Sequence, residues 1–427
     1  MKALMLTPDE GHLDRRIAQE AGTLARRGWT VDIYPAVDPA LDFEADLAPG
    51  VRLLANPRPR AGPPGSGKRL MRRAKRTLNR LAPAASRLVE SIQYRRRDNA
   101  AEIAEANLAH LLEIGPYDTV FAHDVPVMPL AARLRSAWGT ILISDLHEVF
   151  PEQDEYFTSN AARGYWRRLE GDGLATSDGI ICVNPAVEAY VRATHSPIAP
   201  IAVVHNAVPY LAPGALRGPV SLRSLYPIPT GVRILLFAGS LRPHKSLEVV
   251  IDGFAAAALD GWVLAILGDG PLQSDLEARV ARHGIAGRVF VGQRAREEDL
   301  IQVAASADVA LLPYQVVGFN YQIATPNKLF EYLQARLPIA TSRLPEIERI
   351  LDPLGTAGFV DFSSPGAMAR GLERFIREGL PTISPEMLER AADLASWERQ
   401  EPALVDLVTR ASATRAATRA SGDPDAT

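Results

Sequence analysis

The chain has 427 residues, which is too long for one compact hydrophobic core and predicts two domains. Its 47% hydrophobic and 23% charged residues are ordinary for a soluble globular protein. The single cysteine, Cys182, excludes an internal disulfide and favours a reducing compartment. We see no secretory signal and no apolar run near the roughly 20 residues that span a bilayer, so we expect a cytoplasmic protein.

In the first half of the chain, short apolar runs alternate with helical patterns such as Arg15–Arg27. Near-continuous apolar strands between helices indicate a parallel sheet covered on both faces. Residues 1–205 are therefore predicted to form a Rossmann-like domain, which the family resemblance given below places on the side of the acceptor substrate. Its predicted strands are Lys2–Leu6, Val31–Tyr34, Thr119–Ala122, Thr140–Ser144, Gly179–Val183 and Ile201–Val204.

A basic segment interrupts this domain. Residues 58–97 hold 13 Lys or Arg and one acid, Glu90, so they carry 13 − 1 = +12, and the rest of the chain carries −3 − 12 = −15. Apolar residues recur at helical spacing between the cations, which favours peripheral attachment to an anionic membrane surface, at the inner face of the cell membrane. The alternative is a solvated arm. A nucleic-acid site is disfavoured because only Tyr94 offers an aromatic platform.

The segment also contains a partial match to a phosphate-binding motif. Gly62–Arg69 has the glycine and lysine spacing of a phosphate-binding P-loop. Arg69 stands where that motif needs a Ser or Thr for magnesium, and no strand runs directly into the loop, so we reject an ATP-binding function.

The second half repeats the strand and helix alternation. Residues 206–230 are rich in Pro and Gly and are predicted to be a linker. Residues 231–384 are predicted to form a second Rossmann-like domain, with helices over Ser246–Ala257 and Leu272–His283. The predicted strands are Arg233–Ala238, Val263–Leu267, Val289–Val291, Val309–Leu312, Ile339–Thr341 and Gly358–Val360. We expect a helix over 385–410 that packs back toward the first domain, and a disordered tail over 411–427.

The predicted fold class is thus α/β, with two doubly wound parallel-sheet domains that face a cleft. Ligands of such sheets bind beyond the carboxyl ends of the strands, so the active site is expected in the cleft between the domains.

The stretch Thr325–Tyr332 combines features of a phosphate site. Pro326 suits the start of a helix, and the free N–H groups and dipole of a helix start attract anions. Lys328 adds a cation, and Glu331, one turn further, could accept hydrogen bonds from the paired hydroxyls of a ribose. This pattern predicts a nucleotide site. Thr325, Asn327, Lys328, Leu329 and Glu331 are the candidate residues.

The run Phe237–Lys245 follows a predicted strand and precedes a helix. Gly239 permits a tight turn, and Arg242, His244 and Lys245 crowd the loop. We favour a clamp on a diphosphate over a solvated loop. The turn at Gly268 fits close approach to a ligand, although an ordinary turn explains it alone. By position only, Gln293 and Arg294 could line a base pocket.

Polar side chains also follow two strands of the first domain. His123 and Asp124 follow one strand, where a histidine could orient the donor or steer a proton. The next strand is followed by Asp145, His147 and Glu148, which suggest a role in binding an acceptor substrate. No metal site is predicted, because a third clear ligand is missing. Asp14, Arg15 and Arg16 are weaker candidates for binding the acceptor substrate, since they could equally be charges at a helix start, with Asp14 well placed to cap the helix.

Several motifs of both halves resemble those of one family. They are ARRGWTVDIY, AHDVPVMPLAARL, SDLHEVFPE, VVHNAV, GSLRPHK, GDGPL, VFVGQ, ADVALLPY and TPNKLFEYLQARLPIA. In this order they resemble the retaining glycosyltransferases of family 4, which have the two-domain GT-B fold. The resemblance covers nearly the whole chain. It implies transfer of a sugar from a nucleotide donor such as a UDP- or GDP-sugar to an acceptor hydroxyl, without a metal or other cofactor.

The resemblance also assigns residues. Glu331 matches the second acid of the family's Glu-x7-Glu motif and would hold the ribose. Lys245 matches the diphosphate lysine, His123 the histidine near the donor sugar, and Gly11 the glycine of the loop near the diphosphate. On this basis the catalytic candidates are His123, Lys245 and Glu331.

Two positions depart from the family pattern. Ile323 stands where the first acid would fall, and Ser240 where an arginine would fall, with Arg242 as a substitute two residues on. The best-supported function is a glycosyltransferase of surface polysaccharide or glycolipid synthesis, with a glycan or lipid-linked acceptor. The alternatives are a non-catalytic GT-B scaffold of a glycan-assembly complex, or an epimerase or phosphorylase on the same fold.

Overall fold

The computed structural model describes residues 1–9, 12–38, 41, 47–58, 99–153, 159–243 and 245–421. The chain divides into two compact units, one of Met1–His205 with Glu401–Thr427 and one of Asn206–Gln400. Of the sequence predictions, Gly11, His244 and all of the basic segment except Arg58 lie outside the described residues.

The first unit is built on a seven-stranded sheet in the order β3-β2-β1-β4-β5-β6-β7, and all its pairings are parallel. The strands are β1 (Lys2–Thr7), β2 (Thr30–Pro35), β3 (Val51–Leu53), β4 (Thr119–His123), β5 (Ile141–Leu146), β6 (Gly179–Cys182) and β7 (Ile201–Val203). Strands β1, β4, β5 and β6 are almost wholly buried, as expected for a sheet with helices on both faces.

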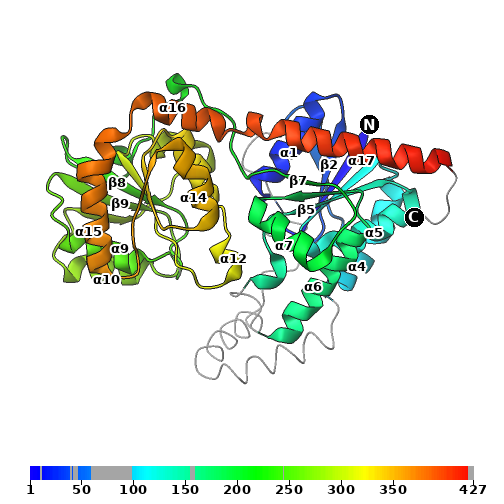
Figure 1. Ribbon diagram of the computed structural model, residues 1–427, viewed down its shortest axis with the longest axis horizontal. Coiled ribbons are helices and arrows are strands. Elements are labelled where there is room, and N and C mark those ends of the chain that lie inside the picture. The colour runs from blue at the N-terminus through cyan, green and yellow to red at the C-terminus, as the bar shows by residue number, and fades with distance from the viewer. Residues whose placement is uncertain are drawn as a thin grey trace. The chain divides into compact units, whose positions relative to one another are not determined.

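The helices of the first unit connect the strands and pack on the sheet (Figure 1). They are α1 (Arg15–Arg26), α4 (Asn99–Ile114), α5 (Met128–Trp138), α6 (Asn160–Ala175), α7 (Pro185–His195) and α17 (Glu401–Ser421). The side chain of Asp14 caps α1 by accepting a hydrogen bond from the Arg16 N–H at 2.9 Å. The last helix, α17, joins this unit although it is far away in the sequence, and Thr23 donates a hydrogen bond to Glu401 at 2.9 Å.

The second unit holds a six-stranded parallel sheet in the order β10-β9-β8-β11-β12-β13. The strands are β8 (Arg233–Ala238), β9 (Trp262–Leu267), β10 (Val289–Gly292), β11 (Val309–Leu312), β12 (Ile339–Thr341) and β13 (Ala357–Phe359). The helices are α8 (Leu222–Leu225), α9 (Leu247–Ala256), α10 (Gln273–Arg282), α11 (Leu300–Ala304), α12 (Phe319–Gln322), α13 (Asn327–Gln334), α14 (Pro345–Leu351), α15 (Pro365–Arg374) and α16 (Pro385–Leu394).

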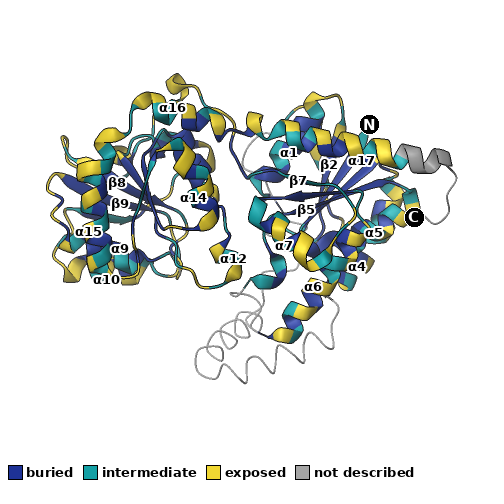
Figure 2. Cartoon of the chain, viewed as in Figure 1, coloured by how far each residue is buried: buried dark blue, intermediate teal, exposed yellow. Residues whose placement is uncertain are grey.

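Side chains of β8 alternate between two hydrophobic cores, one on each face of the second sheet. Ile234 and Leu236 belong to the core that includes α13 and α14, whereas Leu235 and Phe237 pack with α9 and α15. Figure 1 shows α9 and α15 on one side of the strands and α14 on the other, and Figure 2 shows that both sheets are buried between helices with exposed outer faces. The predicted fold class is therefore confirmed.

Both sheets have one point where the strand order reverses. In the first sheet it lies between β1 and β4, and in the second it lies between β8 and β11. Loops that leave the carboxyl ends of the strands diverge there, which creates a crevice for ligands. Asp14 follows β1 and His123 is the last residue of β4, at the first reversal point, and Lys245 and Tyr314 come from loops at the second.

The structure corrects three details of the predicted organisation. The sequence patterns missed β3, an edge strand of only three residues. The predicted linker is part of the second unit, because Ala207, Val208, Leu222 and Tyr226 are buried in its core. The predicted helix over 385–410 is two helices, α16 and α17, and α17 continues through the predicted disordered tail to Ser421.

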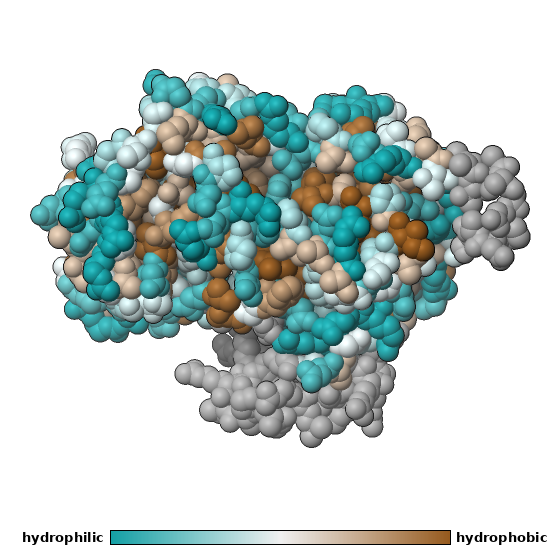
Figure 3. All heavy atoms as spheres, in the orientation of Figure 1, coloured by the Kyte–Doolittle hydropathy of each residue, from teal (hydrophilic) through white to brown (hydrophobic). Residues whose placement is uncertain are grey.

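Among the described residues, no helix combines the length and apolar character needed to cross a bilayer. On the face drawn in Figure 3, hydrophobic residues lie between hydrophilic ones.

Candidate functional site

The loops after β8, β9 and β10 are joined by backbone hydrogen bonds at the carboxyl edge of the second sheet. The Gly239 N–H donates to the Leu267 carbonyl, and the Gly268 N–H donates to the Gln293 carbonyl, both at 2.9 Å. Gly268 has φ +141°, and a Cβ added there would lie 1.9 Å from the Gly239 carbonyl oxygen. Only glycine fits this position, so the sequence fixes how closely the two loops approach.

Lys245 lies in the loop between β8 and α9, next to the loop that follows β11. Its Nζ atom is 3.8 Å from the centroid of the Tyr314 ring. This is a cation–π contact, which holds the ammonium group over the aromatic face. The two residues thus connect loops on either side of the strand-order reversal, where the sequence predicts a diphosphate clamp.

Helix α13 begins directly after Pro326, which has φ −65° and ψ 139° and gives the helix no side-chain cap. The helix is fixed against β8, because the Tyr332 hydroxyl accepts a hydrogen bond from the Ala238 N–H at 2.8 Å. Asn327 accepts a hydrogen bond from the Asn206 side chain at 2.8 Å. The start of an eight-residue helix is therefore held rigidly near the Gly239 loop, with its dipole favouring an anion.

Lys328 and Glu331 pair with each other on the first turn of α13. The Lys328 Nζ donates to Glu331 Oε2 at 2.6 Å, and only 7% of the Glu331 side chain is exposed. The sequence predicted separate roles for the two, with the lysine on a phosphate and the glutamate on a ribose. The structure shows that the lysine also neutralises and orients the buried carboxylate.

The remaining candidates of the second unit differ in accessibility. The side chain of Leu329 lies fully buried in the core and its N–H donates to the Pro326 carbonyl, and its contact with the nucleotide-sugar donor stays a prediction. Thr325 is also buried. Arg242, Gln293 and Arg294 are exposed, and Arg294 lies 3.5 Å from Asp269.

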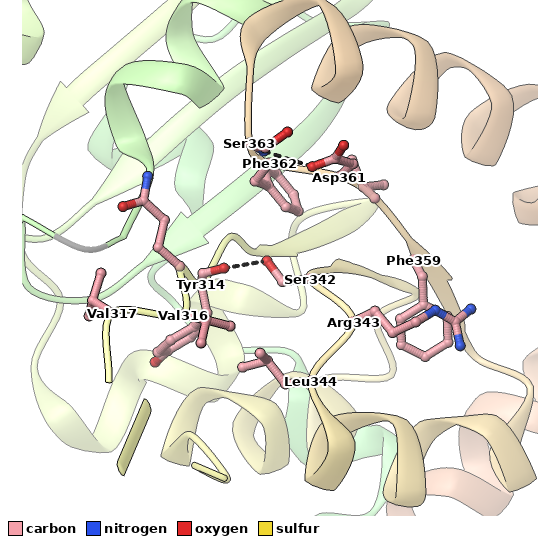
Figure 4. Close-up of a pocket in the computed structure, with 12 residues that line it drawn as sticks. Tyr314, Val316, Val317, Ser342, Arg343, Leu344, Phe359, Asp361, Phe362 and Ser363 are labelled. Carbon is pink, nitrogen blue, oxygen red and sulfur yellow. Dashed lines mark hydrogen bonds between the residues drawn. The ribbon is translucent and has the colours of Figure 1, made fainter. Parts of the chain in front are cut away.

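A pocket of about 660 Å³ adjoins this region at the carboxyl ends of β11, β12 and β13. Figure 4 shows that Tyr314 and Ser342 meet on its wall, where the Ser342 hydroxyl donates to the Tyr314 carbonyl at 2.7 Å. Its lining residues are Tyr314, Gln315, Val316, Val317, Ser342, Arg343, Leu344, Phe359, Val360, Asp361, Phe362 and Ser363.

The first unit has a second polar cluster, at the carboxyl ends of β4 and β5. Asp145 Oδ2 lies 3.0 Å from His123 Nδ1 and 3.0 Å from His147 Nε2. An ionised carboxylate only accepts hydrogen bonds, so His123 carries its proton on Nδ1. Its Nε2 is then a buried acceptor that has no hydrogen-bond partner among the described residues.

Arg16, which the sequence offered as a weak acceptor candidate, and Glu20, which it did not single out, complete this cluster. Arg16 donates to both carboxylate oxygens of Asp145, at 3.1 and 2.8 Å, and to the Val204 carbonyl at 2.6 Å. Glu20, one turn later on α1, lies 3.2 Å from Arg16, and both side chains are fully buried. The available signal in the sequence was that Arg16 and Glu20 have opposite charges and lie four positions apart, beside the apolar face of α1.

Burial and mutual charge set the protonation of the cluster. Burial disfavours the charged forms of both Asp145 and His147. The charge of Arg16 nevertheless holds the pKa of Asp145 well below its usual range. The charges of Asp124 and Asp145 raise the pKa of His147 well above the usual range of a histidine. Burial and the Asp145 charge raise the pKa of Glu20 to about 8. The cluster is therefore a charged pair, Asp145 and His147, beside a glutamic acid that stays protonated near neutral pH.

His123, Asp145 and His147 have the ligand types and spacing of a metal site, with the His123 Nδ1 and His147 Nε2 atoms 3.4 Å apart. The structure thus supplies the third side chain that the sequence argument lacked. However, Asp145 Oδ2 also accepts a hydrogen bond from Arg16 and is already surrounded by three donors. The hydrogen-bond network accounts for this geometry without an ion.

The other first-unit candidates take different places. Asp14 caps α1, which is one of its two predicted roles, and its Oδ2 atom lies 3.5 Å from His147 Nδ1. Asp124 accepts a hydrogen bond from the His147 N–H at 3.0 Å. Glu148 accepts a hydrogen bond from Gln153. Arg15 begins α1 and is partly exposed.

Comparisons with known proteins agree with both units. Residues 13–207 match the family model of the glycosyl transferase 4-like domain, and residues 222–394 match that of glycosyl transferases group 1. The D-inositol 3-phosphate glycosyltransferase of Mycolicibacterium smegmatis is 27% identical over 327 residues, which cover 74% of this chain and 68% of that protein.

Solved structures show the same fold. Sucrose-phosphate synthase from Thermosynechococcus elongatus aligns with a TM-score of 0.69 at 20% identity, over 97% of this chain and 99% of that one. Anabaena HepE in complex with UDP aligns with a TM-score of 0.63 at 14% identity, over 98% of this chain and 100% of that one. With two matching family models that together span most of its length, this chain belongs to the family 4 type of glycosyltransferases with the GT-B fold.

Proposed function

We propose that this chain is a retaining, metal-independent transferase that moves a sugar from a nucleoside diphosphate to an acceptor hydroxyl. The observation that carries the proposal is the convergence of Lys245, the start of α13 and Glu331 beside the strand-order reversal of the second sheet. A cation, a helix start and a buried carboxylate are the groups that a diphosphate joined to a ribose requires. Anabaena HepE, which has the same fold, binds UDP.

In this proposal, protein groups neutralise the departing diphosphate. Lys245 moves from the face of Tyr314 to a phosphate oxygen, and the N–H groups at Asn327 and Lys328 face the other phosphate. Such preorganised donors stabilise the charge that develops as the bond between the anomeric carbon and the phosphate oxygen breaks. Arg242 adds a second cation from the same loop as Gly239.

Glu331 accepts hydrogen bonds from the ribose hydroxyls, while the hydrogen bond from Lys328 holds its carboxylate in place. The base lies toward Gln293 and Arg294, which leave the carboxyl end of β10. Gly239 and Gly268 let the backbone approach the nucleotide, because neither has a side chain that would separate the loops.

The acceptor side of the proposal rests on His123. Its unpartnered Nε2 is an acceptor to which a substrate hydroxyl can donate, which would remove the cost of a buried polar atom without a partner. The ring is fully buried, so a hydroxyl reaches it only after a local movement of its neighbours. His147 adjoins the Nδ1 edge of the His123 ring, and Asp14 and Asp124 lie 3.5 and 3.6 Å from His147 Nδ1.

A non-catalytic nucleotide-binding scaffold is the second candidate. The observation that favours it is Ile323, which stands in place of the family's first acid and is only 7% exposed. The two functions differ in one measurement, the slow release of nucleoside diphosphate from a donor sugar by water. An enzyme releases it, and a scaffold binds the donor unchanged.

The binding test uses UDP, GDP and dTDP with the full chain, by calorimetry. One of them should bind, and Lys245→Ala should weaken that binding by about 10- to 100-fold, because a hydrogen bond to a charged group contributes about 1.5–3 kcal/mol. Lys2→Ala is the matched control, since Lys2 also stacks on a tyrosine, Tyr117, at 4.6 Å. Equal effects of the two substitutions would contradict the proposed site.

We also propose that the chain acts at an anionic membrane surface on a glycan or lipid-linked acceptor of surface polysaccharide or glycolipid synthesis. The support is the sequence charge of residues 58–97. Co-sedimentation with vesicles that contain anionic lipid, but not with neutral vesicles, is the expected result.

A further inference from the structure

The loop between β11 and α13 exposes an unusual group of hydrophobic side chains. Val316, Val317 and Phe319 are 60%, 36% and 41% exposed. Single exposed hydrophobic residues are common, but three within four positions form a patch of the kind that marks a ligand surface. Figure 3 shows hydrophobic residues on the surface in the part of the second unit where Figure 1 places α12.

The same loop has no charged side chain from Gln315 to Ala324. Ile323 occupies the position at which the family resemblance places an acid on the donor sugar. An acid there would accept hydrogen bonds from sugar hydroxyls, and isoleucine cannot. The loop is therefore suited to a sugar with fewer hydroxyl groups than a simple hexose.

The pocket behind this loop has an apolar part and a polar part of similar extent. Val316, Val317, Leu344, Phe359 and Phe362 contribute hydrophobic surface. Figure 4 shows these side chains around the cavity, with Arg343 lying over the Phe359 ring at 4.1 Å.

Three polar side chains of the pocket, Ser342, Asp361 and Arg343, already have protein partners. The Ser342 hydroxyl donates to the Tyr314 carbonyl, and Asp361 accepts a hydrogen bond from the Ser363 N–H at 2.8 Å. Arg343 forms an ion pair with Glu348. A ligand hydroxyl placed among the apolar side chains would lose hydrogen bonds to water without full replacement, whereas a methyl group would gain from burial.

The pocket shares Tyr314 with the proposed donor site. Tyr314 forms part of the pocket wall and also carries the Lys245 ammonium on its ring. All lining residues belong to the second unit and leave the carboxyl ends of three neighbouring strands, β11, β12 and β13. A group attached to a diphosphate at Lys245 thus lies next to this pocket.

We infer that the transferred sugar carries an apolar substituent, a methyl group of a deoxy or N-acetyl sugar, and that the β11–α13 loop and its pocket select it. The inference rests on the proposed function, since it requires a nucleoside diphosphate at Lys245. It names a specificity that the family resemblance leaves open.

The test compares donors that share one nucleotide. Affinities of the full chain are measured by calorimetry for UDP-glucose against UDP-N-acetylglucosamine, GDP-mannose against GDP-rhamnose, and dTDP-glucose against dTDP-rhamnose. The affinity for each nucleotide sugar is divided by the affinity for its nucleoside diphosphate alone. Within the pair whose nucleotide binds, the substituted sugar should bind at least about tenfold more tightly, as expected for one methyl group in a fitting apolar pocket.

Two substitutions and one control test whether the β11–α13 loop causes the preference for the substituted sugar. Val316→Asp changes an exposed side chain of the loop and should reduce the preference to about threefold or less. Leu394→Asp is the matched control, because Leu394 is a 43% exposed hydrophobic residue of α16 in the same unit, and the preference should remain. Ile323→Glu restores an acid and should shift the preference toward the hydroxylated sugar.

The outcomes separate this inference from the proposed function. Equal or tighter binding of the hydroxylated sugars, or an unchanged preference in Val316→Asp, would overturn the inference while nucleotide binding at Lys245 stands. Failure of UDP, GDP and dTDP to bind would overturn both.

Discussion

Lys245 and Tyr314 are in contact across the point where the strand order of the second sheet reverses, with the lysine Nζ 3.8 Å from the ring centroid. The contact joins the loop after β8 to the loop after β11, which are the loops that open the crevice of a doubly wound sheet. Each proposal for the second unit depends on this relationship.

The carboxylate of Glu331 should determine the preference for ribose over deoxyribose. Wild-type protein should bind the preferred nucleoside diphosphate about 10- to 100-fold more tightly than its 2′-deoxy form, because a hydrogen bond to a charged group contributes about 1.5–3 kcal/mol. In Glu331→Gln this ratio should fall to a few-fold. Calorimetry with both ligands measures it, and an unchanged ratio in the variant would place the ribose elsewhere.

Gly268 should tolerate no side chain. Its φ of +141° and the 1.9 Å approach of a Cβ to the Gly239 carbonyl mean that Gly268→Ala must push the loops after β8 and β9 apart. We expect a loss of nucleotide affinity of more than about tenfold, from a displacement on the order of 1 Å.

Gly284→Ala is the control for backbone strain. Gly284 also has positive φ, +67°, but a Cβ there has no atom within 4 Å. This variant should lose about 1 kcal/mol of stability and keep its nucleotide affinity. Similar affinities of the two variants would contradict the role of the glycine loops.

The sequence predicted most strands because their residues are apolar for four or more consecutive positions, as in β8 and β9. It missed β3, whose three residues include the exposed Arg52. It treated the segment around Tyr226 as a linker, because the Pro and Gly content conceals apolar side chains that only the folded core brings together. Local composition predicts turns well, but it does not predict which distant residues are buried together in the folded core.

The candidate sites show the same limit. Lys245 and Glu331 could be selected because their loops follow strand ends in recognisable order. The pairing of Lys328 with Glu331 and the burial of Leu329 depend on side-chain directions around α13, which a motif does not give. Arg16 and Glu20 looked like ordinary charges at the start of a helix, and only the fold places them against Asp145.

Arg16 should be essential for the stability of the first unit. Arg16→Met leaves the fully buried Asp145 carboxylate without its bidentate partner, which should cost about 3–5 kcal/mol in the free energy of unfolding. Asp145→Asn in the same chain removes the unpaired charge, so the double variant should lose less than Arg16→Met alone. Urea unfolding monitored by circular dichroism measures both, and additive losses would contradict this coupling.

Glu20 should make stability fall as pH rises. Its pKa is about 8 in the folded protein and about 4.5 when unfolded, so between these values only the unfolded chain releases the proton. The stabilising effect of this proton is present below about pH 4.5 and is lost progressively up to about pH 8. Glu20→Gln should therefore match the wild-type unfolding midpoint near pH 5 and exceed it near pH 8.5.

The control for this pH effect is Glu102→Gln, a change of an exposed glutamate in the first turn of α4. It should shift the unfolding midpoint equally at both pH values. A Glu20→Gln effect that does not change with pH would show that Glu20 is ionised in the folded protein.

The central claim is that the second unit binds the diphosphate of a nucleotide sugar with its own cations and a helix start. A crystal structure of the full chain with the best-binding donor or its nucleoside diphosphate tests this most directly. We expect one phosphate within hydrogen-bond distance of the Lys245 Nζ, the other at the N–H groups that begin α13, and the ribose at Glu331. A nucleotide bound away from Lys245 and Glu331, or a diphosphate held by a metal ion in place of these groups, would contradict the account.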